Sequence, residues 1–211
     1  MMIRPIMPDF SAFTADGYVG IANCLIILIS TALAAYLVSA YAAKRFKGNK
    51  QTTALGFIGI AVCFAVLLIC FFGCTAVTVR GIIFCIILIL SSYSDIRTRE
   101  CNDWLHVMIV TAAFIGCEFS NLANMFVSAM FTGGIMLLTA LITDCKKVGG
   151  ADIKFAAACS FLLGLEKSII ALIVGMISAV IINLCRGKEK RKSGFPLIPY
   201  IAAGYLAAYL I

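Results

Sequence analysis

Long apolar runs separated by short polar stretches make up most of the chain. Eight runs can be drawn, over about residues 18–43, 54–79, 82–93, 104–119, 122–143, 152–164, 168–185 and 196–211. A helix that crosses a bilayer needs about 20 apolar residues, within a range of about 17–25. The pattern therefore predicts an all-α fold, a polytopic bundle of about eight transmembrane helices. The run at 82–93 is short, so it is expected to be tilted or to begin before Arg80.

The composition requires lipid around the protein. Hydrophobic residues make up 63% of the chain and charged residues 13%, against about 45–50% and about 25% in soluble domains. A chain of 211 residues cannot hide that much apolar surface from water, so the bilayer must cover it. The N-terminus lacks the pattern of a cleaved signal peptide, because acidic residues precede the first run and the basic cluster follows it. Residues 1–211 are therefore expected to form one integral membrane domain.

Basic residues predict the orientation of the bundle in the cell membrane. The loops after the first, third, fifth and seventh runs hold 14 of the 17 Lys and Arg residues. The positive-inside rule assigns these loops to the cytoplasm and both termini to the outside. The net charge of +7 is thus explained by orientation, and no zinc finger, helix-turn-helix or aromatic-rich basic stripe indicates a nucleic-acid partner.

The cysteines do not suggest a metal centre. There are ten, scattered mostly through the apolar runs, and none forms a C-x-x-C pair; the single histidine is His106. Free cysteine inside an apolar helix behaves as a small hydrophobic residue. Neither a metal site nor a disulfide framework is predicted, and no cofactor is expected.

Two carboxylates stand out because each lies at the cytoplasmic end of an apolar run. Asp95 follows the third run in Ser94-Asp95-Ile96-Arg97, and Asp152 opens the sixth run after Gly149-Gly150-Ala151. Two spans separate them, so they are expected on the same face of the membrane. An acid at the edge of hydrocarbon is costly and is a functional hypothesis by default.

Two carboxylates held close together cannot easily both ionise, so they share a proton. One can then act as a base on water while the other acts as an acid toward a carbonyl oxygen, as in aspartic proteases. Gly149 and Gly150 would admit unusual backbone angles or let an extended substrate lie beside Asp152. The spacing alone is equally consistent with a plain glycine loop and an ordinary helix cap at Asp152.

Three stretches, in this order, resemble the type IV prepilin peptidase family of membrane aspartic proteases. Residues 94–99 resemble its first-aspartate motif, Gly149-Gly150-Ala151-Asp152-Ile153-Lys154 resembles its G-x-G-D-x-K motif, and residues 195–204 resemble its proline-containing C-terminal helix. The resemblance covers about residues 80–211 and leaves 1–79 as additional N-terminal spans.

The resemblance implies a function and a set of site residues. Asp95 and Asp152 correspond to the catalytic pair, and Lys154 to a basic residue with an electrostatic or structural role. The implied substrate is a prepilin-like precursor of a type IV pilus system, cut after a glycine at the end of a basic cytoplasmic leader. The active site is thus expected to face the cytoplasm.

The chain departs from the family pattern in three places. Ala151 replaces a glycine and must therefore adopt ordinary backbone angles, and Asn102 stands where proline is frequent. The paired C-x-x-C motifs of the bifunctional members are absent, so peptidase activity without methylation is expected.

Several residues keep more than one interpretation. Glu100, Asp103 and Asp144 are candidates for attracting the basic leader, although Asp144 could equally pair with Lys146 or Lys147. His106 is more readily explained by packing than by catalysis. At the level of the whole chain, the alternatives are a multi-spanning transporter, which would carry acids and broken helices near the midplane, and a non-catalytic assembly factor. A presenilin-like protease is a weaker match, because Asp95 is not preceded directly by tyrosine.

Overall fold

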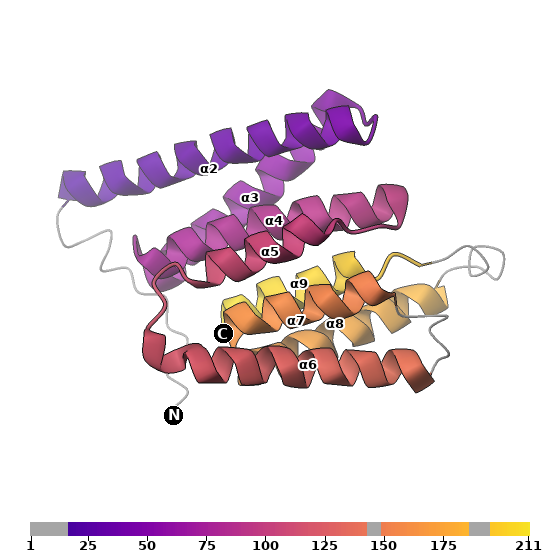
Figure 1. Ribbon diagram of the computed structural model, residues 1–211. Coiled ribbons are helices and arrows are strands. Elements are labelled where there is room, and N and C mark those ends of the chain that lie inside the picture. Colours follow the sequence, from indigo (N-terminus) through magenta and orange to yellow (C-terminus); the bar gives the residue numbers. More distant parts are fainter. Residues whose placement is uncertain (1–16, 143–148, 186–194) are drawn as a thin grey trace. The chain divides into compact units, whose positions relative to one another are not determined.

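The computed structural model describes residues 17–142, 149–185 and 195–211, and all regular structure within them is helical (Figure 1). The all-α prediction is confirmed. In chain order the elements are α2 (Gly17–Arg45), α3 (Lys50–Phe72), α4 (Ala76–Thr98), α5 (Asp103–Ala113), the 3-10 turn η1 (Phe119–Asn121), α6 (Leu122–Ile142), α7 (Gly150–Leu163), α8 (Leu165–Cys185) and α9 (Ile198–Tyr209).

The predicted count of about eight spans is wrong by helix length. In the described part of the chain, five helices are long and apolar enough to cross a membrane: α2, α3, α4, α6 with its preceding 3-10 turn, and α8. The helices α5, α7 and α9 have 11, 14 and 12 residues. At about 1.5 Å per residue they reach only about 17–21 Å, short of the roughly 30 Å hydrocarbon core.

The third run begins before Arg80, one of the two possibilities that its short length left open, because α3 ends at Phe72 and α4 begins at Ala76. Gly73 adopts φ 64°, and its N–H bonds the carbonyl of Ile69, which ends α3 there. The chain then enters α4, where the Thr78 hydroxyl donates to the Gly73 carbonyl at 2.6 Å. Arg80 therefore lies inside α4 and does not separate two helices. One continuous helix leads from this turn to Asp95 in its last turn.

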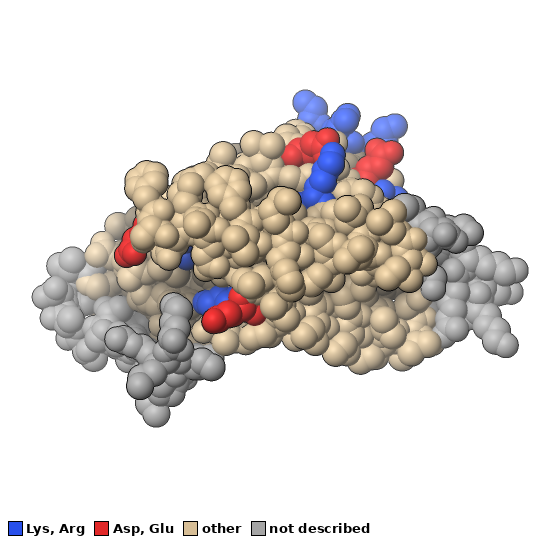
Figure 2. Space-filling model, turned by 60° about the horizontal axis from the view of Figure 1, so that its bottom comes forward, with Lys and Arg blue, Asp and Glu red and all other residues tan. Residues whose placement is uncertain are grey.

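The outer surfaces of the long helices suit a lipid environment. On α6 and α8, large apolar side chains such as Met130, Leu138, Ile173 and Ile177 are between about half and three-quarters exposed. On the face shown in Figure 2, acidic and basic side chains form a few small groups on a mostly uncharged surface. Water would not tolerate such a surface on a monomeric domain, so the apolar faces are those that lipid covers.

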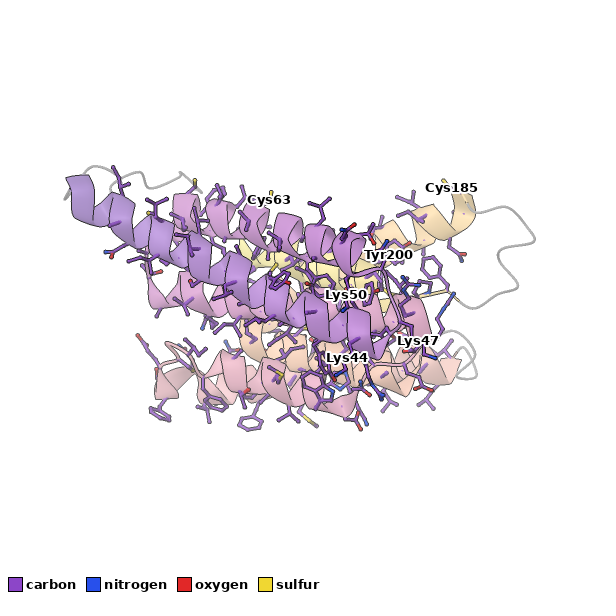
Figure 3. All side chains as sticks on the ribbon, turned by 90° about the horizontal axis from the view of Figure 1, so that it is seen from above. Lys44, Lys47, Lys50, Cys63, Cys185 and Tyr200 are labelled. Carbon is purple, nitrogen blue, oxygen red and sulfur yellow. The ribbon has the colours of Figure 1, made fainter. Side chains whose placement is uncertain are left out.

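Contacts divide the chain into two compact units, and the boundary lies inside α4, between Ile86 and Ile87. In the first unit α2 and α3 pack against one another as a hairpin. Asn49 caps α3 by accepting the N–H of Gln51 at 3.1 Å. Lys44, Lys47 and Lys50 gather around this turn (Figure 3), as the charge pattern of the loops predicts.

The second unit, Ile87–Tyr209, is organised around α7. This helix packs against α5, α6, α8 and α9, and the side chains of its second half are almost all buried. Tyr205 of α9 is fully buried; its hydroxyl lies 2.8 Å from the Ser160 hydroxyl and donates to the carbonyl of Ala156 at 3.0 Å. The helix that carries Asp152 is thus the central element of its unit.

Two glycines allow α8 and α9 to pack with their backbones in contact. A Cβ on Gly204 would collide with the carbonyl oxygen of Ala171, and one on Gly175 would lie 2.9 Å from the Cα of Ile201. Small residues at such positions let neighbouring membrane helices approach closely.

Candidate active site

Asp95 lies on α4 one turn before the helix ends, and only 7% of its surface is exposed. Its Oδ2 accepts the backbone N–H of Ile198 at 3.2 Å, a contact across 103 positions of sequence. Ile198 is the first residue of α9. The unpaired N–H groups and the dipole of a helix N-terminus favour negative charge. The C-terminal helix therefore supplies a donor to the first predicted catalytic carboxylate.

Hydroxyl groups of the first-aspartate motif build the turn that follows Asp95. Ser94 Oγ donates to the carbonyl of Glu100 at 2.8 Å, and Thr98 Oγ1 donates to the carbonyl of Ser94 at 2.9 Å. Arg99 adopts φ 60°, a left-handed conformation that commonly ends a helix. These contacts give Ser94 and Thr98 a local structural role, which is to turn the chain directly after the carboxylate.

Asp152 is the third residue of α7, and its position is set by its own helix. Its Oδ2 accepts the N–H of Gly149 at 2.9 Å, which is the half of a capping box that the third helical residue supplies. The N-cap is therefore Gly149, and Asp152 reaches back to it from the first turn. The side chain is half-buried. Burial raises the pKa of Asp152 above its ordinary value, and the Gly149 N–H acts in the opposite direction.

The two predicted catalytic aspartates lie close enough for their charges to interact. Cys101, in the loop after α4, lies near both of them and near Asp103. Burial, with these carboxylates adding to it, raises the pKa of Cys101 to about 11, although a hydrogen bond with Ser91 acts against the rise. A thiol with this pKa stays protonated at neutral pH and is a poor nucleophile. The sequence offered no signal that Cys101 belongs near the aspartates, since the cysteines are scattered.

The glycines before Asp152 do not adopt unusual backbone angles. Gly149 has φ −83° and ψ 157°, and Gly150 is helical. Among the described glycines only Gly73, Gly116 and Gly164 have positive φ. Among the residues that the structure describes, a Cβ at Gly150 would meet no atom within 4 Å, and one at Gly149 would lie 3.5 Å from Asp152 Oδ2. Unusual backbone angles are therefore not the role of this pair, and passage of a substrate beside Asp152 stays a prediction.

Ala151 adopts the ordinary backbone angles that its replacement of a glycine requires. It is the second residue of α7 and has no positive φ, so its methyl group does not strain the backbone. Asn102 occupies the N-cap position of α5 but forms no side-chain capping bond. Both departures from the family pattern are therefore accommodated in ordinary helix-start geometry.

Lys154 pairs with a carboxylate from α5. Its Nζ donates to Asp103 Oδ1 at 2.8 Å, and this hydrogen bond holds the pKa of Asp103 below its ordinary value. Asp103 is the first residue of α5, so the pair joins the start of α5 to the first turn of α7. Two roles were predicted for Lys154, one electrostatic and one structural. The contact fits the structural role, because that role requires a nearby carboxylate.

His106 packs inside the same seam. Its ring meets Phe155 edge-on with the ring centroids 6.2 Å apart. The Nδ1 atom lies 3.6 Å from Asp103 Oδ1, and neither ring nitrogen forms a hydrogen bond in the described part of the chain. The packing interpretation of His106 fits this geometry. Glu100 is exposed, while Asp144 and its lysine neighbours lie outside the described residues.

No group of three or more His, Cys, Asp or Glu side chains among the described residues is arranged to hold a metal ion. The arrangement offers two carboxylates within reach of electrostatic interaction, each with one oxygen bonded to a backbone N–H. Such a pair can exchange protons with a bound water and a substrate carbonyl.

Residues 82–184 match the Type IV leader peptidase family. The matched segment contains Asp95, Asp103, Asp152 and Lys154, and it ends within α8, before α9 begins. Comparisons with curated proteins and with solved structures gave no match.

Proposed function

The chain belongs to the type IV leader peptidase family, and from this premise we propose that it is a membrane aspartic endopeptidase that removes the leader of prepilin-like precursors. Membership makes the chain a leader-peptidase-like protease, and its five long apolar helices fit a multi-pass membrane protein. The substrate, the identity of the catalytic pair and the membrane face of the site are the proposed parts.

One observation carries the proposal: the fold brings Asp95 and Asp152 within electrostatic reach of one another. They come from different helices, and each uses Oδ2 for a backbone N–H. Those contacts orient both side chains, and within the described parts of the chain Oδ1 of each has no hydrogen bond and can meet water or substrate. A pair held in this way needs no nucleophilic side chain to hydrolyse a peptide bond.

The reaction follows from the shared proton. The ionised carboxylate takes a proton from a water molecule, whose oxygen attacks the carbonyl carbon of the scissile bond. The protonated carboxyl gives its proton to the carbonyl oxygen, which stabilises the tetrahedral intermediate. When the C–N bond breaks, a carboxyl returns a proton to the leaving amine nitrogen. The pair ends with one proton between its two members, as it began.

The position of the site suits a substrate cut at a membrane boundary. Asp95 lies in the last turn of α4 and Asp152 in the first turn of α7. The open space at Gly149 and Gly150 would let an extended leader backbone pass beside Asp152. The basic leader would remain in water while the apolar helix of the precursor stays in lipid. By the count of basic residues, this boundary is the cytoplasmic one.

Two features favour hydrolysis over transport. Asp95 lies at the end of an unbroken α4, whereas transporters place discontinuous helices and their acids near the midplane. The two carboxylates come from different helices and lie within reach of electrostatic interaction, which suits shared-proton chemistry. A non-catalytic assembly factor would have no need for this pairing.

The test is cleavage of a prepilin-like precursor in membranes that contain each aspartate variant. Asp95→Ala and Asp152→Ala should each lower the cleavage rate by at least about 100-fold, the usual worth of a positioned acid or base. Glu118→Ala is the matched control, because Glu118 is exposed and makes no side-chain capping bond. Full cleavage by either aspartate variant would disprove the assignment of the pair.

A further inference from the structure

Two cysteine thiols meet in the first unit, far along the chain from the aspartates. Cys24 Sγ and Cys74 Sγ lie 3.5 Å apart. Cys24 is near the start of α2, and Cys74 lies in the short turn between α3 and α4. Of the nine cysteines in the described part of the chain, no other two thiols are in hydrogen-bonding contact. The scattered spacing of the cysteines predicts no disulfide. Spacing does not show which helix ends lie side by side, so it could not indicate this pair.

The surroundings of the pair allow a bond to form. Joining the two sulfur atoms requires them to approach from 3.5 Å to about 2.05 Å. Cys24 is held in a helix and only 6% exposed, whereas Cys74 is exposed and outside any helix. A shift of about 1.5 Å therefore falls on the turn, where neither helix ladder has to break. The exposed Cys74 is also the sulfur that a reagent from solution can reach.

The pair lies at the end of the hairpin opposite its basic turn. Lys44, Lys47 and Lys50 surround the turn between α2 and α3 (Figure 3). Cys24 and Cys74 lie at the start of α2 and just after α3, which is the other end of the same two helices. The positive-inside rule assigns the basic end to the cytoplasm. The thiols then face the outer side, where disulfides form and persist.

We infer that Cys24 and Cys74 are a disulfide-forming pair that closes the outer end of the α2–α3 hairpin. The oxidant is a disulfide-bonded protein or small disulfide on the outer side. Cys74 thiolate attacks one sulfur of that disulfide and releases the other as a thiol. Cys24 then loses its proton and attacks the Cys74 sulfur, which releases the second oxidant thiol. Two protein thiols are oxidised, one external disulfide is reduced to two thiols, and two protons are transferred.

This inference is independent of the proposed peptidase activity, because it involves neither aspartate nor any residue of the second unit. The bond would link the start of α2 to the start of α4 covalently. It would restrict separation of α2 from α3 without adding a group to the candidate active site. The predicted consequence is a hairpin that resists opening under oxidising conditions and loosens on reduction.

The experiment measures which thiols are protected from alkylation in the full chain. One sample of membranes is prepared without reductant, and a second is treated with oxidised glutathione. Both are denatured in the presence of N-ethylmaleimide, which alkylates the free thiols. They are then reduced and labelled with a polyethylene-glycol maleimide. We expect two added polymer masses on the gel, and mass spectrometry of the unreduced digest should contain a peptide pair joined through Cys24 and Cys74.

Cysteine variants show whether the added polymer masses come from this pair. Cys24→Ser and Cys74→Ser should each abolish both added masses, whereas the matched control Cys63→Ser, on an exposed thiol of α3, should keep them. The linked peptide of the unmodified chain gives the result even where a variant folds poorly. Complete alkylation of both thiols after oxidised glutathione, or an unchanged shift in Cys24→Ser, would overturn the inference.

Discussion

The two aspartates have the same proposed chemistry but different supports. Asp152 takes its donor from Gly149, three residues earlier in the same helix start. Asp95 takes its donor from Ile198, which lies 103 positions further along the chain. A local capping contact forms wherever the helix forms, whereas a long-range contact forms only when α9 is in place. The geometry at Asp95 therefore depends more strongly on tertiary packing.

A substitution at Gly150 can test for substrate contact without disturbing the fold. A Cβ there meets no atom of the described residues within 4 Å, so Gly150→Val should leave the fold intact. If the leader backbone passes at this point, the side chain should obstruct it and raise KM by about tenfold, a typical effect of displacing one contact. Steady-state cleavage of a precursor peptide measures this change.

The matched control for Gly150 is Gly134→Val on α6. A Cβ at Gly134 also meets nothing within 4 Å, but this position lies away from the helix starts that carry the site. The Gly134→Val variant should cleave the precursor at the normal rate. Equal and normal KM values for both variants would show that the substrate does not approach Gly150.

At the scale of helices, the Asp103–Lys154 pair connects the loop after Asp95 to the helix start of Asp152. Both side chains are more than half exposed, so their ion pair contributes little to overall stability. Its expected effect is on position, because the same contact joins α5 to the first turn of α7. Lys154 lowers the pKa of Asp103, so the pair persists above about pH 4 and is lost as Asp103 is protonated at lower pH.

Charge reversal tests this positioning role. Asp103→Asn and Lys154→Gln should each lower kcat by about tenfold with little change in KM, because small displacements of reacting groups slow the chemical step. The double variant Asp103→Lys with Lys154→Asp should recover most of the lost kcat, since it restores the pair with the charges exchanged. Cleavage kinetics in membranes provide both constants.

The double variant also separates two roles for Lys154. A lysine that contacts the substrate directly would not be replaced by a lysine on α5, so the exchanged pair would then stay inactive. Normal kcat in both single variants would exclude a role of the ion pair in the reaction.

The N-terminus of α9 can be tested without changing any charge. Ile198 is the first residue of its helix, a position where proline is tolerated and lacks an N–H. Ile198→Pro should therefore keep α9 but remove the donor to Asp95. A hydrogen bond to a charged group contributes about 1.5–3 kcal/mol, which corresponds to a loss of roughly 10- to 100-fold in the cleavage rate.

Valine at the same position is the control, because Ile198→Val keeps the N–H and removes one methylene from a side chain that is 1% exposed. It should cleave at close to the normal rate. Thermal unfolding in detergent checks that the proline variant remains folded. A folded Ile198→Pro variant with normal activity would show that this hydrogen bond is dispensable.

At the scale of the molecule, apolar runs and helix lengths carry different information. The runs predicted the helices at α2, α6 and α8 to within a few residues, because hydrophobic burial in lipid is readable from composition. They predicted too many spans, because a run continues through residues that a turn has already removed from the helix. At α5, for example, the helix ends at Ala113, whereas the predicted run continues to residue 119.

In the candidate site, too, some features could be predicted from the sequence and others depend on helix packing. Motif spacing and the count of intervening runs predicted one face for Asp95 and Asp152, which stays a prediction, since of the two intervening helices only α6 is long enough to span a membrane. They could not indicate that Asp103 would be the partner of Lys154, since 51 positions separate the two and several other acids were available. Partner choice of this kind depends on which helix faces meet, and no local pattern records it.

The sequence by itself determined that this chain is a helical membrane protein and marked two acids at helix ends, because apolar length and short motifs are local properties. The tertiary structure decided which helices are long enough to span, which backbone N–H meets Asp95, and that Cys24 lies beside Cys74. These outcomes depend on how helices pack, and packing is set by shape and small residues such as Gly175 and Gly204 acting across distant segments.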